Sequence, residues 1–117
     1  RSDRTLLVVD DDESVRGFVS RVLREAGYQV REAASPGDAL LECEGRLDQI
    51  DLLVSDLAMP RITGVELARR LRVERPDLPC IFMSGYASDG APIPETDSLV
   101  PKPVSPAMST WCNSNCG

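Results

Sequence analysis

Three short apolar runs, each followed closely by polar side chains, restrict the folds open to this chain more than any other feature. The runs are Leu6–Val9, Leu52–Val54 and Ile81–Met83. Strands without polar alternation are typical of parallel sheets, in which both faces are covered. Segments with helical periodicity separate the runs, and this alternation indicates βαβ units. We therefore expect a parallel sheet covered by helices.

Stop and cap signals place three helices in the connecting segments. The first helix has an apolar stripe that ends at Gly27, a typical helix stop. The second begins after Ser35, with Pro36 at its first position. The third runs from about Gly64 to a residue before Pro76. The expected inner face of the second helix consists of Ala39, Leu40, Cys43 and Leu47.

Two further strands complete the expected sheet. Residues 28–33 alternate as an edge strand does, and residues 99–100 form a short last strand. The predicted fold class is α/β, a doubly wound five-stranded parallel sheet in the flavodoxin-like order 2-1-3-4-5. We expect one domain over residues 1–106 and an irregular tail over residues 107–117.

The last part of the chain has weak helical signals. Gly90, Pro92 and Pro94 leave room for about one helical turn, so the fourth helix is expected to be short or absent. Residues 111–117 show no helical periodicity, so the fifth helix is expected to be truncated. One side of the central strands would then expose apolar surface, which we expect a second copy or a neighbouring segment to cover.

Composition excludes several classes of function. The chain has no histidine, which removes Ser-His-Asp and Cys-His nucleophile pairs and His-containing zinc sites. Its 117 residues carry a net charge of −6, which argues against contact with nucleic acid or an anionic membrane. No apolar run approaches the roughly 20 residues of a membrane span, so we expect a cytoplasmic location. Cys80, inside an apolar run, is interpreted as a buried structural thiol.

Carboxylates follow two of the buried strands. Asp10 and Asp11 come directly after the first strand, and Asp56 follows the third. In the order 2-1-3-4-5 these strands are neighbours, so their carboxyl ends share one crevice. Carboxylates gathered there repel one another, and a hard divalent cation such as Mg²⁺ is the simplest compensation. Asp12 and Glu13 are explained by the start of a helix instead.

Two other polar side chains follow the last strands. Ser84 ends the fourth strand and Lys102, the only lysine of the chain, ends the fifth. Both are therefore expected at the rim of the same crevice. Together with the carboxylates they would supply a hydroxyl donor and a cation to an added anion.

Four motifs contain these polar residues. They are Val8-Val9-Asp10-Asp11, Ser55-Asp56-Leu57-Ala58-Met59-Pro60 with Gly64, Met83-Ser84-Gly85 and Lys102-Pro103. The four motifs resemble those of response-regulator receiver domains, the CheY-like family. The resemblance covers about residues 4–106 and, around Ser84 and Lys102, is strongest to receivers of hybrid sensor histidine kinases.

The resemblance implies a phosphoacceptor of a two-component system or phosphorelay. Asp56 would accept a phosphoryl group from a phosphohistidine on a sensor histidine kinase or a histidine phosphotransfer protein. Asp10, Asp11, Asp56 itself and the backbone carbonyl of Ala58 would hold Mg²⁺. Such a domain catalyses its own phosphorylation and dephosphorylation, so we do not expect an enzyme that acts on other substrates.

The resemblance also implies roles around the transferred group. Ser84 would donate a hydrogen bond to one phosphoryl oxygen, and Lys102 would pair with another. Tyr86, two residues beyond Ser84, is a candidate for shielding the site. By the same resemblance, a partner is expected to dock near the first helix, where Arg16 and Arg21 are expected to face water.

Other classes of function fit the sequence less well. A receiver-like interaction module without phosphorylation would keep the fold, but such modules usually lose one of the site residues, and all are present here. A haloacid-dehalogenase-like phosphatase places an acid two residues after its nucleophile, where this chain has Ala58. A dinucleotide-binding protein requires GxGxxG after the first strand, where this chain has acids.

Overall fold

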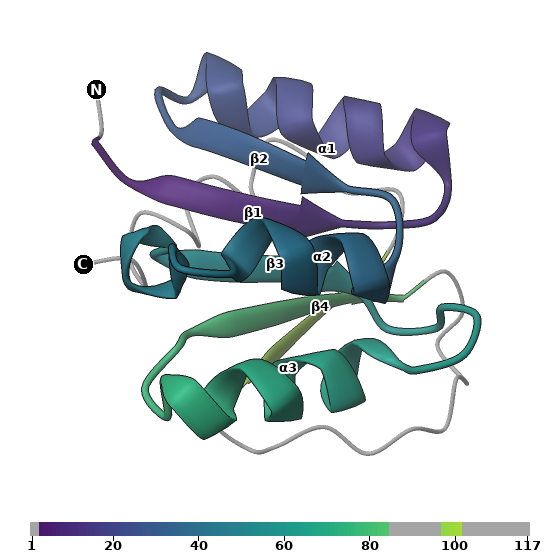
Figure 1. The fold of residues 1–117 in the computed structure, drawn as a ribbon. Coiled ribbons are helices and arrows are strands. Elements are labelled where there is room, and N and C mark those ends of the chain that lie inside the picture. Colours follow the sequence, from purple (N-terminus) through teal and green to yellow (C-terminus); the bar gives the residue numbers. More distant parts are fainter. Residues whose placement is uncertain (1–2, 85–96, 102–117) are drawn as a thin grey trace.

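The computed structural model describes residues 3–84 and 97–101 (Figure 1). This part of the chain contains five strands, three α-helices and one short 3₁₀ helix, which confirms the α/β class. The elements are β1 Thr5–Val9, α1 Glu13–Glu25, β2 Gln29–Ala33, α2 Pro36–Cys43, the 3₁₀ helix Leu47–Gln49, β3 Leu52–Asp56, α3 Gly64–Glu74, β4 Cys80–Ser84 and β5 Ser98–Pro101.

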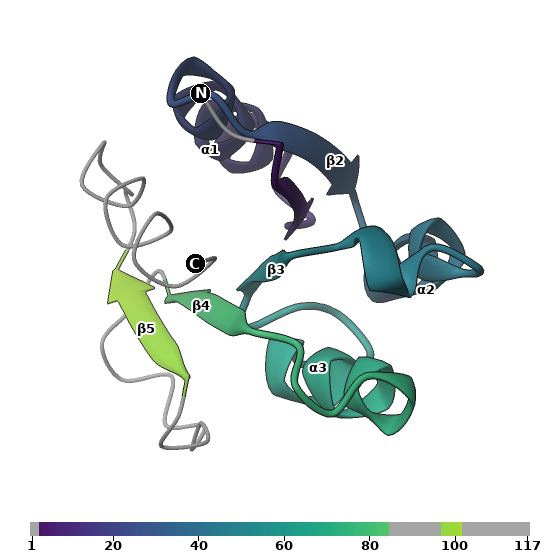
Figure 2. The same cartoon turned by 90° about the vertical axis from the view of Figure 1, so that its left-hand side faces the viewer.

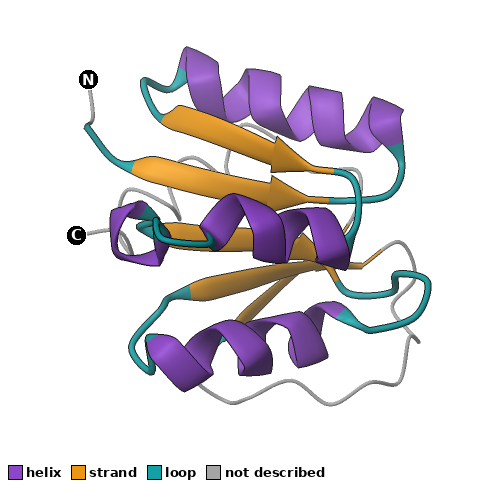
Figure 3. Cartoon of the chain, viewed as in Figure 1, coloured by secondary structure: helices purple, strands orange, loops and turns teal. Residues whose placement is uncertain are grey.

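The five strands are all parallel and lie in the order β2-β1-β3-β4-β5. The predicted order 2-1-3-4-5 is therefore confirmed. Every residue of β3 and β4 is buried, as is all but the first residue of β1, whereas β2 at the edge is mostly half-exposed or exposed. The apolar runs of the sequence thus lie within the central strands, which are covered on both faces. Because the strands run in one direction, their carboxyl ends meet at one edge of the sheet (Figure 3).

Helices cover both faces of the sheet (Figure 2). α1 lies on one face, and α2 and α3 lie on the other. Successive strand residues point to opposite faces. Leu7 and Val9 therefore enter the core beneath α2 and α3, whereas Leu6 and Val8 enter the core beneath α1. All four side chains are completely buried, and burial of each contributes about 1.5–3 kcal/mol.

Side-chain caps fix the start of each of the three described α-helices. Asp12 accepts hydrogen bonds from two first-turn amides of α1, which is the helix-start role expected of it. Ser35 caps α2 in the same way, with Pro36 at the first position, so the predicted start of this helix is confirmed. Thr63 caps α3. Each cap satisfies amides that a helix leaves without an internal partner.

The second helix is shorter than the sequence predicts. α2 ends at Cys43, and Gly45 has a φ of 73°, a conformation that stops a helix. Leu47, predicted on the inner face of this helix, lies in the 3₁₀ helix instead. It is nevertheless buried in the same core cluster as Ala39.

The expected fourth and fifth helices and the tail over residues 107–117 fall on parts of the chain outside the described residues. The expectation that a second copy or a neighbouring segment covers one side of the central strands therefore stays a prediction. The side chains on the α1 side of β3 and β4 belong to one core cluster and are completely buried. They are Leu52, Val54, Ile81 and Met83. Among the described helices, none has the length and apolar character needed to cross a bilayer.

Gly64, the first residue of α3, is packed too closely to carry a side chain. A Cβ at this position would collide with the backbone carbonyl oxygen of Asp56 and lie 3.0 Å from the Oγ of Ser55. Gly17, inside α1, has no atom within 4 Å of an added Cβ. An added methyl group is therefore expected to affect the free energy of unfolding differently at the two glycines.

Gly64→Ala is expected to lower the free energy of unfolding by about 2 kcal/mol, because the methyl group displaces the backbone of Asp56. The matched control Gly17→Ala is expected to raise it by about 0.5–1 kcal/mol, since alanine favours helix more than glycine does. Urea unfolding followed by circular dichroism measures both. A Gly64→Ala chain as stable as the wild type would contradict the close packing.

Two cysteine thiols, those of Cys43 and Cys80, are free and buried in the core. Burial raises the pKa of Cys80 to about 12, although the nearby guanidinium of Arg72 acts in the opposite direction. Burial also raises the pKa of the Cys43 thiol. The interpretation of Cys80 as a buried thiol is confirmed.

Both thiols are expected to resist alkylation by iodoacetamide at neutral to mildly alkaline pH in the native chain and to react readily in urea, because the thiolate is the reactive form. Peptide mass spectrometry reports the labelling of each cysteine separately. Rapid native labelling of Cys80 would show that this thiol is more accessible than the structure indicates.

Candidate functional site

The pairing of β1 with β3 brings two acidic residues to one edge of the sheet. Val9 pairs with Ser55 in this parallel register, so Asp10 and Asp56 are the next residues along the two strands. β3 extends beyond its apolar run, which ends at Val54, because Ser55 and Asp56 continue the pairing with β4. The position of both acids thus follows from strand register.

Asp10, Asp11 and Asp56 form a carboxylate cluster. One carboxylate oxygen from each residue lies within 4.8 Å of the others. Asp10 is completely buried, Asp56 is 5% exposed and Asp11 is exposed. The cluster is therefore open to solvent on the side of Asp11. The structure brings together the three acids that the sequence predicts in one crevice.

Hydrogen bonds fix the main chain and the side chain of Asp10. Its amide donates to the carbonyl oxygen of Ala33 at 3.2 Å, which continues the pairing of β1 with β2. Its Oδ1 accepts from the amide of Asp12 at 2.9 Å. Its carbonyl oxygen accepts from Nη1 of Arg16 at 2.8 Å. The backbone of Asp10 and one oxygen of its carboxylate are thus held in place.

Of the other predicted site residues, Ser84 and Ala58 are among the described residues. Ser84 ends β4 and is buried, one residue beyond the partner of Asp56 in the register of β3 with β4. It therefore lies at the same edge of the sheet as the carboxylate cluster. Ala58 lies two residues after Asp56, in the loop before α3, and is exposed. Lys102 and Tyr86 fall outside the described residues.

Arg16 lies next to the site, and the expectation that its side chain faces water is wrong. Its side chain is 15% exposed and donates to the carbonyl oxygen of Asp10 and to Glu32. Arg21 is exposed as expected, and its guanidinium lies 5.6 Å from the centroid of the Phe18 ring. One signal was available for Arg16: a helical side chain leans toward the N-terminus, so an arginine one turn after a cap reaches the preceding loop.

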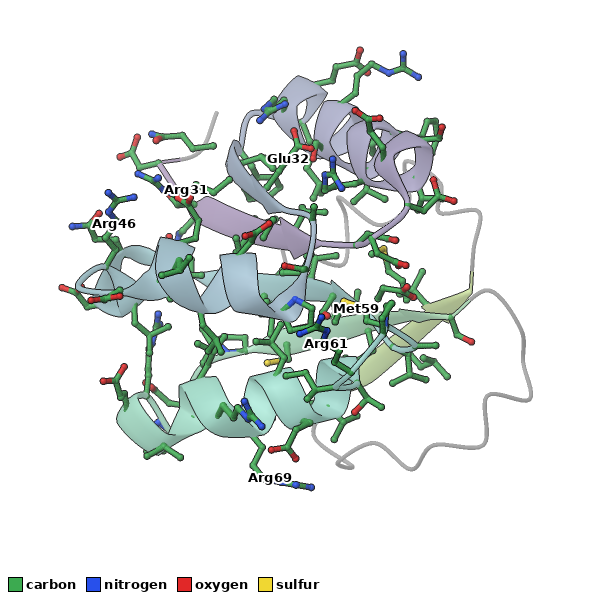
Figure 4. All side chains as sticks on the ribbon, turned by 45° about the vertical axis from the view of Figure 1, so that its right-hand side comes forward. Arg31, Glu32, Arg46, Met59, Arg61 and Arg69 are labelled. Carbon is green, nitrogen blue, oxygen red and sulfur yellow. The ribbon has the colours of Figure 1, made fainter. Side chains whose placement is uncertain are left out.

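A groove of about 500 Å³ borders the exposed side of the carboxylate cluster. Asp11 lines it, together with Leu40 of α2 and with Arg61 and Ile62 of the loop between β3 and α3. Figure 4 shows Arg61 on this loop with Met59 close by. Arg61 has a φ of 77°, which is uncommon for a residue with a side chain. The loop between β3 and α3 thus turns at Arg61 beside the groove.

The chemistry of the carboxylate cluster suits a hard cation. Carboxylates a few ångströms apart repel one another in a partly buried site, and a bound cation offsets this repulsion. Mg²⁺ prefers oxygen ligands, takes one or two carboxylates and keeps several waters. The cluster supplies carboxylate oxygens and is open to solvent at Asp11. The donor set therefore fits Mg²⁺.

The fold and the site together define a small flavodoxin-like domain with an acidic site at the carboxyl edge of its sheet. Residues 6–106 match the response regulator receiver domain. The chain therefore belongs to the family of response regulator receiver domains, as the motifs predict. Members of this family occur both as response regulators and within sensor kinases.

The similar proteins include both kinds. The sensor kinase CckA of Brucella abortus is 41% identical over 105 residues, which cover 86% of this chain and 11% of the kinase. The response regulator receiver protein CpdR of the same organism is 35% identical, over 73% of this chain and 69% of that protein. The solved receiver domain of the hybrid histidine kinase CckA has a TM-score of 0.83 and 32% identity, covering 97% of this chain and 99% of that one. The resemblance to hybrid-kinase receivers is confirmed.

Removing one charge from the carboxylate cluster is expected to stabilise the metal-free chain. Asp11→Asn should raise the free energy of unfolding by about 1 kcal/mol in EDTA at low salt, because it relieves repulsion with Asp10 and Asp56. Asp12→Asn is the matched control, since asparagine keeps the helix cap and the substitution removes the same charge outside the cluster. Urea unfolding measures both, and an equal effect of the two substitutions would argue against repulsion within the cluster.

Proposed function

We propose that this chain is the phosphoacceptor receiver of a two-component system or phosphorelay and that Asp56 accepts the phosphoryl group. The carboxylate cluster is the observation that carries the proposal, because Asp56 ends β3 within 4.8 Å of Asp10 and Asp11. One carboxylate oxygen of Asp56 forms a bond to phosphorus as the bond from phosphorus to the donor imidazole nitrogen breaks. The chain has no histidine, so the donor lies outside this sequence.

The cluster residues are proposed to hold Mg²⁺. Asp10 and Asp11 would do so together with Asp56 and the backbone carbonyl of Ala58. When bound, Mg²⁺ would neutralise negative charge on the carboxylates and on the phosphoryl oxygens. The hydrogen bonds that fix Asp10 support this role, because a ligand that is already oriented loses little freedom on binding.

Two residues from the last strands are proposed to bind the phosphoryl group. The Ser84 hydroxyl would donate to one phosphoryl oxygen, and the Lys102 ammonium would pair with another. The place of Ser84, at the end of the strand beside β3, supports its part. Lys102 follows Pro101, the last residue of β5. Tyr86 is proposed to shield the site, and its distance of two residues from Ser84 is the supporting observation.

The proposed donor is a phosphohistidine of a sensor histidine kinase or a histidine phosphotransfer protein. Similarity to the sensor kinase CckA supports this class of partner. We place the chain in the cytoplasm, in agreement with the free thiols of Cys43 and Cys80. The pair of Arg21 with the partly exposed Phe18 ring on α1 is the expected contact with the donor, in place of Arg16.

Incubation of the chain with acetyl phosphate and Mg²⁺ is expected to add a single phosphoryl group, detected by intact-mass spectrometry. Asp56→Asn and EDTA should each abolish the adduct, because one removes the acceptor and the other removes the cation. Asp12→Asn is the matched control and should keep the adduct, since its carboxylate caps α1 and lies outside the cluster.

Two results would contradict the proposal. One is the absence of an adduct in the wild-type chain, and the other is an adduct that survives Asp56→Asn. Either would favour a receiver-like interaction module that works without phosphorylation.

A further inference from the structure

We propose that Arg16 is a positioning residue that sets the geometry of Asp10 and Asp11, an inference that rests on the metal-dependent function proposed for the carboxylate cluster. Arg16 begins in the first turn of α1, yet its guanidinium returns to the end of β1. Nη1 donates to the carbonyl oxygen of Asp10 at 2.8 Å, and Nε donates to Oε1 of Glu32 at 3.2 Å. One side chain thus joins α1, β1 and β2.

The carbonyl group that Arg16 binds belongs to the peptide unit between Asp10 and Asp11. A peptide unit is planar, so fixing its C=O also fixes the N–H of Asp11 and the direction in which the chain leaves Asp10. The preceding amide, that of Asp10, is held by Ala33 of β2. With both bonds made, the two acids keep a set position relative to each other. Loss of the Arg16 bond would free the peptide unit on which the exposed Asp11 depends.

Glu32 in turn fixes Arg16. Figure 4 shows Glu32 on β2 beside α1. Its Oε1 accepts from Arg16, and its Oε2 accepts from Nη1 of Arg24 at 3.2 Å. The Arg16 side chain is 15% exposed, whereas the Arg24 side chain is 51% exposed. The bonds of Arg16 are therefore less screened by solvent than those of Arg24.

Arg24 provides a matched control for Arg16. Both lie on α1, both carry one positive charge and both pair with Glu32. The second acceptor of Arg24 is the carbonyl oxygen of Val30, at 3.1 Å, and not a group of the carboxylate cluster. Replacing Arg24 therefore removes the same charge and half of the Glu32 contacts, but leaves the Asp10 carbonyl bound.

The first test compares Mn²⁺ binding by the wild-type 117-residue chain, Arg16→Ala and Arg24→Ala. Electron paramagnetic resonance detects free Mn²⁺, and competition with Mg²⁺ reports on the same site. Arg16→Ala is expected to weaken Mn²⁺ binding about tenfold, the usual effect of losing a group that orients metal ligands. Arg24→Ala is expected to bind Mn²⁺ as the wild type does.

The second test uses the metal-free chain. Amide hydrogen exchange is measured by nuclear magnetic resonance at Asp10 and Asp12, whose amides donate to Ala33 and to Oδ1 of Asp10. Exchange at both is expected to be faster in Arg16→Ala than in Arg24→Ala, because only Arg16→Ala loosens the peptide unit after Asp10.

Arg16→Lys serves as the conservative variant. A lysine keeps a charged donor but lacks the guanidinium fork that reaches two acceptors at once. Its Mn²⁺ affinity is expected to lie between those of the wild type and Arg16→Ala. It also keeps the proposal testable if Arg16→Ala fails to fold.

Two results would overturn the positioning role and leave the proposed function intact. One is wild-type Mn²⁺ affinity in Arg16→Ala and Arg16→Lys, and the other is an equal loss of affinity in Arg16→Ala and Arg24→Ala. A wild-type chain that binds no Mn²⁺ would overturn the proposed metal-dependent function, and this inference with it.

Discussion

The parallel pairing of β1 with β3 is the constraint on which the rest of the structure depends. The register that places Val9 opposite Ser55 also carries Asp10 and Asp56 to the same edge of the sheet. A slip of one residue would turn every side chain of β1 to the opposite face and exchange the two cores. The burial of the apolar side chains therefore sets the register, and the register assembles the carboxylate cluster.

Repulsion within the carboxylate cluster is expected to lower the free energy of unfolding, and apolar burial elsewhere in the fold offsets this loss. A completely buried carboxylate such as Asp10 is unfavourable unless donors compensate it, and the amide of Asp12 is one such donor. The central strands, buried on both faces, supply the apolar contacts that offset the repulsion. Energetically unfavourable groups of this kind are expected at functional sites, because function requires buried polar side chains that do not contribute to stability.

Much of the fold was predictable because the apolar pattern, the helix caps and the expected strand order all indicate the same α/β fold. The cluster acids converge because topology alone brings them together. Two features depend on contacts in three dimensions and were not predictable. The end of α2 is decided by the backbone turn at Gly45, and the Arg16 side chain reaches Glu32 of β2 and the carbonyl oxygen of Asp10, just after β1. Lys102 and Tyr86 stay predictions.

The loop between β3 and α3 is anchored at both ends. The amide of Leu57 donates to Met83 at 2.8 Å, and that of Gly64 donates to Leu57 at 2.9 Å, with Gly64 packed against Asp56. Residues 60–63 between these anchors are exposed or half-exposed. We expect this segment to accept an inserted residue or an attached reporter group while Asp56 and the start of α3 keep their places. The two ends of this loop are fixed, whereas the length of the exposed segment between them is free to vary.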